Sequence, residues 1–281
     1  MHLMIILFAL GCAVGLRLIP LSQGENWHQR WQKSLFLFVC PPLVLLMTAL
    51  AVLSMGTKGE MLGLQASWFS CFLALGFIGW GILTVIKLIG QLWQSQYRIH
   101  RLSQQVVMGK TARILEDDFP YSAQIGFWQP QLVVSRGLLN LLDETHLEAV
   151  IAHEQAHLNY RDTFWFFILG WLQTLTSWLP NTNQLWQELL LLREMRADRY
   201  ATQQIDPLLL AESLLYLAKA PFKSPDYGNL SFSCSIRSSR LEERIDAILT
   251  EDSAPLTWGW WVWILLFWVC LPWITVPFHY S

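Results

Sequence analysis

Charged residues are scarce in this chain of 281 residues. They make up 14% of it, against about 25% in ordinary globular proteins, while apolar residues make up 53%. This composition excludes a disordered chain and argues against a free soluble enzyme. The net charge of −2 provides no basic face for nucleic acid, so we expect no nucleic-acid partner.

Cysteine is also rare, with five residues and no C-x-x-C spacing: Cys12, Cys40, Cys71, Cys234 and Cys270. Four of them lie in apolar runs. We therefore expect small buried hydrophobic side chains rather than a disulfide framework.

Both ends of the chain carry few charged residues. Of the 19 Lys and Arg residues, 14 fall between Arg98 and Arg244, and of the 21 Asp and Glu residues, 19 fall between Glu116 and Asp252. Four segments are apolar enough to cross a bilayer: Leu3–Gly15, Leu35–Met55, Trp68–Ile86 and Leu256–Pro277. The first has no basic leader and no small-residue cleavage site, so an anchor is expected rather than a cleaved signal peptide. The 16 Trp residues suit bilayer interfaces.

These runs predict a mostly α integral membrane protein with about four transmembrane helices and a cytoplasmic α+β domain. Residues 1–93 form the N-terminal membrane region, with spans near 3–20, 34–56 and 66–93. Residues 94–255 form the charged domain, and residues 256–281 form a C-terminal transmembrane helix.

Orientation follows the Lys/Arg bias. Arg17, Arg30 and Lys33 precede the second span, Lys58 alone follows it, and Lys87, Arg98 and Arg101 follow the third. The segment before the second span and the charged domain are therefore expected in the cytoplasm, in a multi-pass protein of a bacterial-type inner membrane.

The charged domain reads as a small sheet followed by helices. Arg113–Leu115, Gln124–Phe127 and Leu132–Ser135 predict strands. Leu147–Leu158 predicts a helix with Asp143 as N-cap and His146 at the N3 position. Further helices are expected to include Leu189–Tyr200, Leu208–Ala218 and Leu241–Leu249, with a loop at Tyr227–Ser239.

The strongest chemical signal is His153-Glu154-Gln155-Ala156-His157, which matches H-E-x-x-H. Residues four apart share one helical face, so His153 and His157 can bind one Zn²⁺. Glu154 projects beside them, where it can accept a proton from water. The alternative is a surface helix that carries two His and a Glu by chance.

A catalytic zinc usually has three protein ligands, so a third is needed. In Arg193-Glu194-Met195-Arg196-Ala197-Asp198, Glu194 can supply it. Asp198 lies one turn later on the same face and can accept the free ring N–H of a ligand histidine. An E-x-x-A-D pattern alone is weak, and its pairing with H-E-x-x-H makes it specific.

H-E-x-x-H followed some forty residues later by E-x-x-A-D resembles the gluzincin membrane peptidases. The runs from Gln131 to Leu139 and from Ala149 to Leu158, with Leu142-Asp143 and Arg161-Asp162, resemble the BlaR/MecR type, here without its penicillin-binding sensor domain. The three-plus-one arrangement of spans resembles it too. The HtpX type is second, because Ser238–Ile245 resembles its E-R-I segment but lacks the His-Pro.

The resemblance implies zinc held by His153, His157 and Glu194, Glu154 as general base, and Asp198 behind the ligands. The donor that stabilises the oxyanion stays open among Arg199, Tyr200, Arg237, Arg240 and Arg244. Gln131–Ser135 is either an edge strand that an extended substrate could join or a plain core strand.

A fifth apolar stretch, Thr163–Pro180, must return to the side on which it started, because His157 and Glu194 flank it. We therefore expect a non-spanning, membrane-associated hairpin near residues 163–188. The expected function is that of a zinc endopeptidase at the cytoplasmic membrane face, with regulatory cleavage of a cytoplasmic or membrane-proximal protein. Quality control of membrane proteins and a non-catalytic zinc-containing signalling scaffold are the alternatives. The expected partners are a protein or peptide substrate and the lipid bilayer. The sequence does not indicate an oligomeric state.

Overall fold

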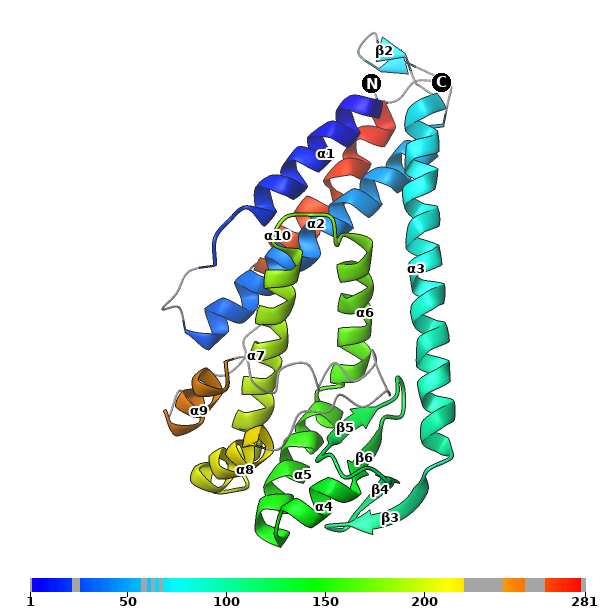
Figure 1. The fold of residues 1–281 in the computed structure, drawn as a ribbon. Coiled ribbons are helices and arrows are strands. Elements are labelled where there is room, and N and C mark those ends of the chain that lie inside the picture. The colour runs from blue at the N-terminus through cyan, green and yellow to red at the C-terminus, as the bar shows by residue number, and fades with distance from the viewer. Residues whose placement is uncertain are drawn as a thin grey trace. The chain divides into compact units, whose positions relative to one another are not determined.

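The computed structural model describes residues 2–21, 26–56, 60–61, 64–65, 68–219, 240–250 and 261–278. The chain divides into two compact units. The first comprises Met1–Lys87, Leu169–Leu189 and Ala254–Ser281, and the second comprises Leu88–Ile168 and Leu190–Ser253. Figure 1 traces the elements in chain order.

The first unit is built on apolar helices. Its elements are α1 (His2–Arg17), α2 (Trp27–Met55), the short β1 (Glu60–Met61) and β2 (Leu64–Gln65), α10 (Trp261–Cys270) and the 3₁₀ helix η3 (Leu271–Phe278). It also holds the first part of α3 (Trp68–His100), the end of α6 (Asp162–Leu175) and the start of α7 (Thr182–Thr202). Helix α2 contains Pro41 and Pro42 and packs against α1, α10 and η3.

Two of the described helices, α2 and α3, are long and apolar enough to cross a membrane. The predicted count of four spans is not supported by the described residues. Helix α1 has 16 residues, or about 24 Å, which is shorter than a hydrocarbon core of about 30 Å. Helix α10 has ten residues before it tightens into η3, and residues 251–260 lie outside the described part.

The stretch near 163–188 is a helical hairpin. Helices α6 and α7 are joined by residues 176–181, where Asn181 has a φ of 53°. The side chain of Asn181 donates to the carbonyl oxygen of Arg17 at 2.8 Å, and the Thr182 hydroxyl donates to the carbonyl oxygen of Thr176 at 2.9 Å. These bonds cap the turn within the first unit.

The second unit centres on a four-stranded sheet in the order β3-β4-β6-β5. The strands are β3 (Ser103–Val107), β4 (Lys110–Leu115), β5 (Ser122–Ile125) and β6 (Gln131–Ser135). Strands β4 and β6 are parallel, and the other two pairs are antiparallel. The predicted strands in β4 and β6 are confirmed, and the strand predicted at Gln124–Phe127 begins and ends two residues earlier, as β5. Strand β3 was not predicted because its residues are mostly polar and exposed.

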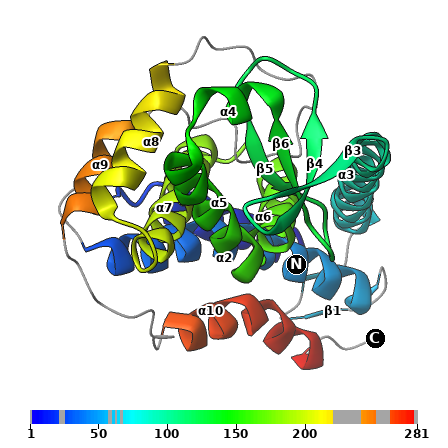
Figure 2. The same ribbon diagram turned by 90° about the horizontal axis from the view of Figure 1, so that it is seen from below.

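Both faces of this sheet are covered. One face packs Ile114 and Val134 against Leu138 of α4 (Arg136–Leu141) and against Val150 and Ile151 of α5 (Glu144–Asn159). The other face packs residues such as Val133 and Tyr121 against Ile99, near the end of α3. Figure 2 shows α4 and α5 beside the strands.

Helices α8 (Pro207–Lys219) and α9 (Leu241–Leu249) complete the second unit and pack with α5 around Ala149, Leu210 and Ile248. The predicted helices in this unit are confirmed, including the Asp143 N-cap, whose side chain accepts from the backbone N–H of His146. The predicted loop at Tyr227–Ser239 lies outside the described residues.

Candidate metal centre

Helix α5 places three chemically active side chains in a buried position. The helix starts at the Asp143 cap, and its apolar residues pack on the sheet. His153, Glu154 and His157 are all buried. Two imidazoles and a carboxylate inside a protein need polar partners, because an unpaired buried charge is costly.

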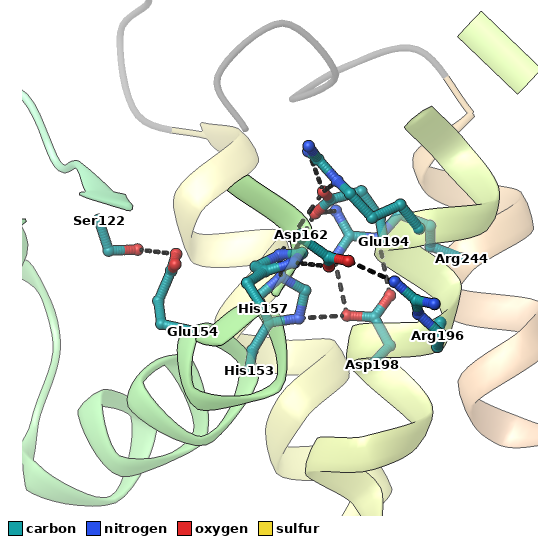
Figure 3. A network of polar contacts seen from close by, with 10 residues as sticks. Ser122, His153, Glu154, His157, Asp162, Glu194, Arg196, Asp198 and Arg244 are labelled. Atoms are coloured by element: carbon teal, nitrogen blue, oxygen red, sulfur yellow. Dashed lines mark hydrogen bonds and ion pairs between the residues drawn. The ribbon is translucent and has the colours of Figure 1, made fainter. Parts of the chain in front are cut away.

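Helix α7 supplies the partner for the two histidines. The ligand atoms of His153, His157 and Glu194 all lie within 4.8 Å of one another. His153 Nε2 is 3.2 Å from His157 Nε2 and 3.3 Å from Glu194 Oε2, and His157 Nε2 is 3.7 Å from Glu194 Oε1. The structure thus brings together the three side chains predicted to bind zinc (Figure 3).

Each histidine is held from behind by an aspartate. Asp198 Oδ1 lies 2.8 Å from His153 Nδ1, and Asp162 Oδ2 lies 2.7 Å from His157 Nδ1. Both contacts leave the Nε2 atoms facing the carboxylate of Glu194. Carboxylates in this position fix the ring orientation and tautomer of metal-binding histidines.

Each aspartate is in turn paired with an arginine, as Figure 3 shows. Arg244, on α9, donates to both oxygens of Asp198 at 2.8 and 2.7 Å. Arg196 donates to Asp162 Oδ1. The charges of Arg244 and His153 outweigh burial, which by itself raises the pKa of Asp198, and keep that pKa below its usual range. Each histidine is thus backed by an Asp–Arg pair, and the two rings face each other through their Nε2 atoms.

Arg193 forms an ion pair with Glu194. Its Nε and Nη2 atoms lie 3.0 and 2.6 Å from Glu194 Oε1, and its guanidinium stacks over the ring of Phe166. Burial alone would raise the pKa of Glu194, but Arg193 and His157 hold it well below its usual range. Burial alone would lower the pKa of His153, but Asp198 and Glu194 raise it to about 10. Glu194 is therefore an anionic carboxylate directed at the two rings.

Glu154 is not part of this cluster. Its Oε1 accepts a hydrogen bond from the Ser122 hydroxyl at 2.8 Å, and Figure 3 shows the side chain directed toward Ser122. Its Oε2 is buried and has no hydrogen-bond partner among the described residues. One oxygen thus orients the carboxylate while the other is free to take a proton.

The order of the strands decides between the two alternatives for Gln131–Ser135. Gln131–Ser135, offered as a possible edge strand, is β6 and lies between β4 and β5, so the alternative of a core strand holds. The sheet ends instead at β5, which carries Ser122. Both strands are short and mostly buried, and only their pairing order, which depends on distant contacts, distinguishes them.

The structure separates the residues considered as oxyanion donors. Arg244 lines a cavity of about 70 Å³ together with Ser122, His153, Glu154 and Glu194. Tyr200 instead accepts from the side chain of Asn159, and Arg240 pairs with Glu243. Arg199 does not line this cavity, and Arg237 lies outside the described residues.

Sequence reasoning missed the roles of Ser122, Asp162 and Arg193. Asp162 follows His157 by five residues and begins α6, a spacing that crosses a helix boundary and so escapes periodicity. Arg193 stands next to Glu194 in sequence, where a helix normally points neighbouring side chains apart. Ser122 comes from a strand with no sequence motif.

The donor set fits a divalent metal. Two imidazoles and one carboxylate are the ligands of several catalytic zinc sites. The Nδ1 atoms are already occupied by aspartates, so the Nε2 atoms are the ones available. These Nε2 atoms and the Glu194 carboxylate converge in a buried region, where one cation could bind all three side chains.

Residues 96–219 match the model of Peptidase family M48, a family of zinc metallopeptidases. The match includes His153, Glu154, His157, Glu194 and Asp198, and α9 with Arg244 lies beyond it. No curated protein matches the chain. This part of the chain is thus similar to M48 peptidases, and the match does not distinguish the BlaR/MecR type from the HtpX type.

Proposed function

We propose that this protein is a membrane-integrated, zinc-dependent endopeptidase that cleaves peptide bonds at the cytoplasmic membrane face. The convergence of His153, His157 and Glu194 beside a carboxylate with one free oxygen, Glu154, carries the proposal. A purely structural metal site has no use for such a carboxylate. The M48 match over the same residues supports it.

The three ligands would hold the metal, which supplies Lewis-acid activation of water and of the scissile carbonyl. Glu154 accepts the proton of the attacking water through Oε2 and then delivers it to the leaving amine. Ser122 keeps the carboxylate in place through Oε1. Arg244 lines the same cavity and is our choice for the group that faces negative charge on the substrate carbonyl.

An extended peptide is the substrate form that suits this site. Strand β5 is at the end of the sheet, and its residue Ser122 contacts Glu154. A peptide that pairs with β5 would run past the carboxylate, and backbone pairing of this kind does not depend on side-chain sequence. Membrane placement rests on α2 and α3 and on the Lys/Arg bias around them.

We further propose a regulatory role, with discrete cleavage of one cytoplasmic or membrane-proximal protein, on the resemblance to the BlaR/MecR type. The alternatives are HtpX-like quality control and a non-catalytic scaffold. Purified protein incubated with a cell lysate separates them when products are identified by mass spectrometry. A single cut in one protein supports regulation, broad degradation of unfolded chains supports quality control, and no zinc-dependent product supports the scaffold.

Zinc dependence and topology have their own tests. Removal of the metal with a chelator should abolish cleavage, and added Zn²⁺ should restore it. Single cysteines placed at Lys58 and at Lys110 should react with a membrane-impermeant reagent from opposite sides of inverted vesicles. Equal labelling from the same side would contradict the proposed orientation.

A further inference from the structure

We propose that an exposed aromatic surface of the second unit binds the headgroup layer of an anionic bilayer, and we call it the aromatic platform. It consists of one face of α3 near Trp93, the β5–β6 loop with Trp128, and the start of α6 with Trp165. This inference rests on the proposed membrane-integrated peptidase and names the class of substrate that it can reach.

Large aromatic rings are exposed at three places that are distant in sequence. Trp93 is 75% exposed, Trp128 72% and Trp165 55%, and Tyr97 on α3 is 61% exposed. Trp128 contacts Phe164, which precedes Trp165, and also lines a groove of about 580 Å³ with Trp93 and His100. Exposed rings of this size, gathered on one side, mark an interaction surface.

The loop that carries Trp128 is fixed in place. Gly126 has a φ of 138°, and a Cβ atom there would lie 2.9 Å from the side chain of Gln96 and 3.0 Å from Pro130. Phe127 packs between Phe164 and Phe167 with ring centroids 5.1 and 5.0 Å apart. Trp128 is thus exposed on a loop whose preceding residues, Gly126 and Phe127, are closely packed. This packing limits how far the loop can move.

The one acidic residue in the platform segments, Asp162 at the start of α6, is buried against His157 and Arg196. No Asp or Glu occurs between Glu60 and Glu116, a segment that contains Lys87, Arg98 and Arg101. Neither of the two hollows beside Trp128 is lined by a carboxylate, and their lining includes His100 and Arg161. Exposed aromatic rings with cations and no exposed acids complement anionic lipid headgroups.

Helix α3 links the platform to the bilayer. Large apolar side chains such as Phe72, Leu83 and Ile89 stay exposed along it, and it is one of the two candidate spans. Trp93 follows Lys87 by six residues, or about 9 Å of helix, which slightly exceeds the roughly 5–8 Å of one headgroup layer. Because α3 is one helix, its exposed apolar side chains extend along it to Trp93 of the platform.

The consequence concerns the substrate. Strand β5 runs from Ser122, which holds Glu154, to the loop with Trp128, a length of four residues or about 13 Å. Anchoring the loop at the headgroups would keep the peptidase site within that order of distance from the bilayer. The enzyme would then cut chain segments that lie next to the membrane, either of membrane proteins or of tethered ones.

The test uses the full-length protein with its cysteines replaced, in nanodiscs of phosphatidylcholine with about 30% phosphatidylglycerol. A single cysteine at Gln129→Cys, beside Trp128, carries an environment-sensitive fluorophore. Gln203→Cys, an exposed glutamine just beyond α7, is the matched control. Quenching is measured with headgroup-spin-labelled lipid and with aqueous iodide.

We expect the label at 129 to be quenched by the spin-labelled lipid and shielded from iodide, with the reverse at 203. Trp128→Ala should reduce the lipid quenching at 129. Equal lipid quenching at both positions, or free access of iodide to 129, would overturn the inference and leave the platform open to a protein partner. Because no catalysis is read, this failure is distinct from failure of the proposed peptidase.

Discussion

His157 Nδ1 lies 2.7 Å from Oδ2 of Asp162, and both side chains are buried. Asp162 lies outside the H-E-x-x-H motif. Asp198 makes the equivalent contact with His153 at 2.8 Å. One aspartate starts α6 and the other lies in α7. The two rings are therefore oriented independently, before any metal binds.

Asp162→Asn should weaken zinc binding. The amide cannot accept and stabilise charge as the carboxylate does, so the affinity should fall about 10–100-fold while the fold persists. Competition with a chromophoric chelator measures it, and Asp206→Asn, at the exposed residue just before α8, is the control, since asparagine can still accept from the backbone N–H of Leu208. Affinity equal to that of the wild type would show that His157 does not need this partner.

Ser122→Ala should lower turnover without loss of metal. The hydroxyl holds one oxygen of Glu154, and a hydrogen bond to a charged group is worth enough to reduce kcat about tenfold. Zinc content and KM should be unchanged, because Ser122 contacts none of the three proposed ligands in Figure 3. A variant that loses zinc as well would indicate a structural role instead.

Gly137→Ala should destabilise the second unit. A Cβ atom there would lie 2.0 Å from the carbonyl oxygen of Asp118, so the backbone must shift, at a cost of about 1–3 kcal/mol. Gly90→Ala in α3 meets no atom within 4 Å and should cause no loss. Thermal unfolding of both variants in the same detergent compares them, and equal midpoints would contradict the packing around α4.

Acid should weaken the start of α5. Hydrogen bonds from the backbone and side chain of His146 lower the pKa of Asp143 to about 2. Because the folded pKa lies below the ordinary value near 4, the stabilisation is complete above that value and is lost as the pH falls through about 2. Asp143→Asn should remove this part of the pH dependence between about pH 4 and pH 2, as followed by thermal midpoints. An unchanged profile would exclude the cap as its source.

Local patterns were enough to predict the helices that carry the site. The spacing of His153 and His157 places both on one face of α5, and the Asp143 cap marks where that helix begins. Glu194 and Asp198 were placed on one face of α7 by the same argument, and the structure brings both to the histidines. These are short-range relations, which periodicity describes well.

Relations between distant segments were not predictable in this way. Strand order decides that β5 rather than β6 ends the sheet, and this depends on pairing across the whole unit. Arg244 reaches Asp198 from 46 positions away. The apolar run in α1 suggested a full span near residues 3–20, whereas the helix ends at Arg17. Hydropathy alone does not determine where a helix ends.

Glu154 is proposed to act as the base of a zinc peptidase. The most direct measurement compares wild type with Glu154→Gln for zinc per chain and for cleavage of an unfolded protein substrate. Glutamine keeps the shape of the side chain and its bond to Ser122 but cannot take up a proton. We predict equal zinc content in both proteins and cleavage by the wild type alone. Equal cleavage by both proteins, or zinc bound by both with cleavage by neither, would contradict the account.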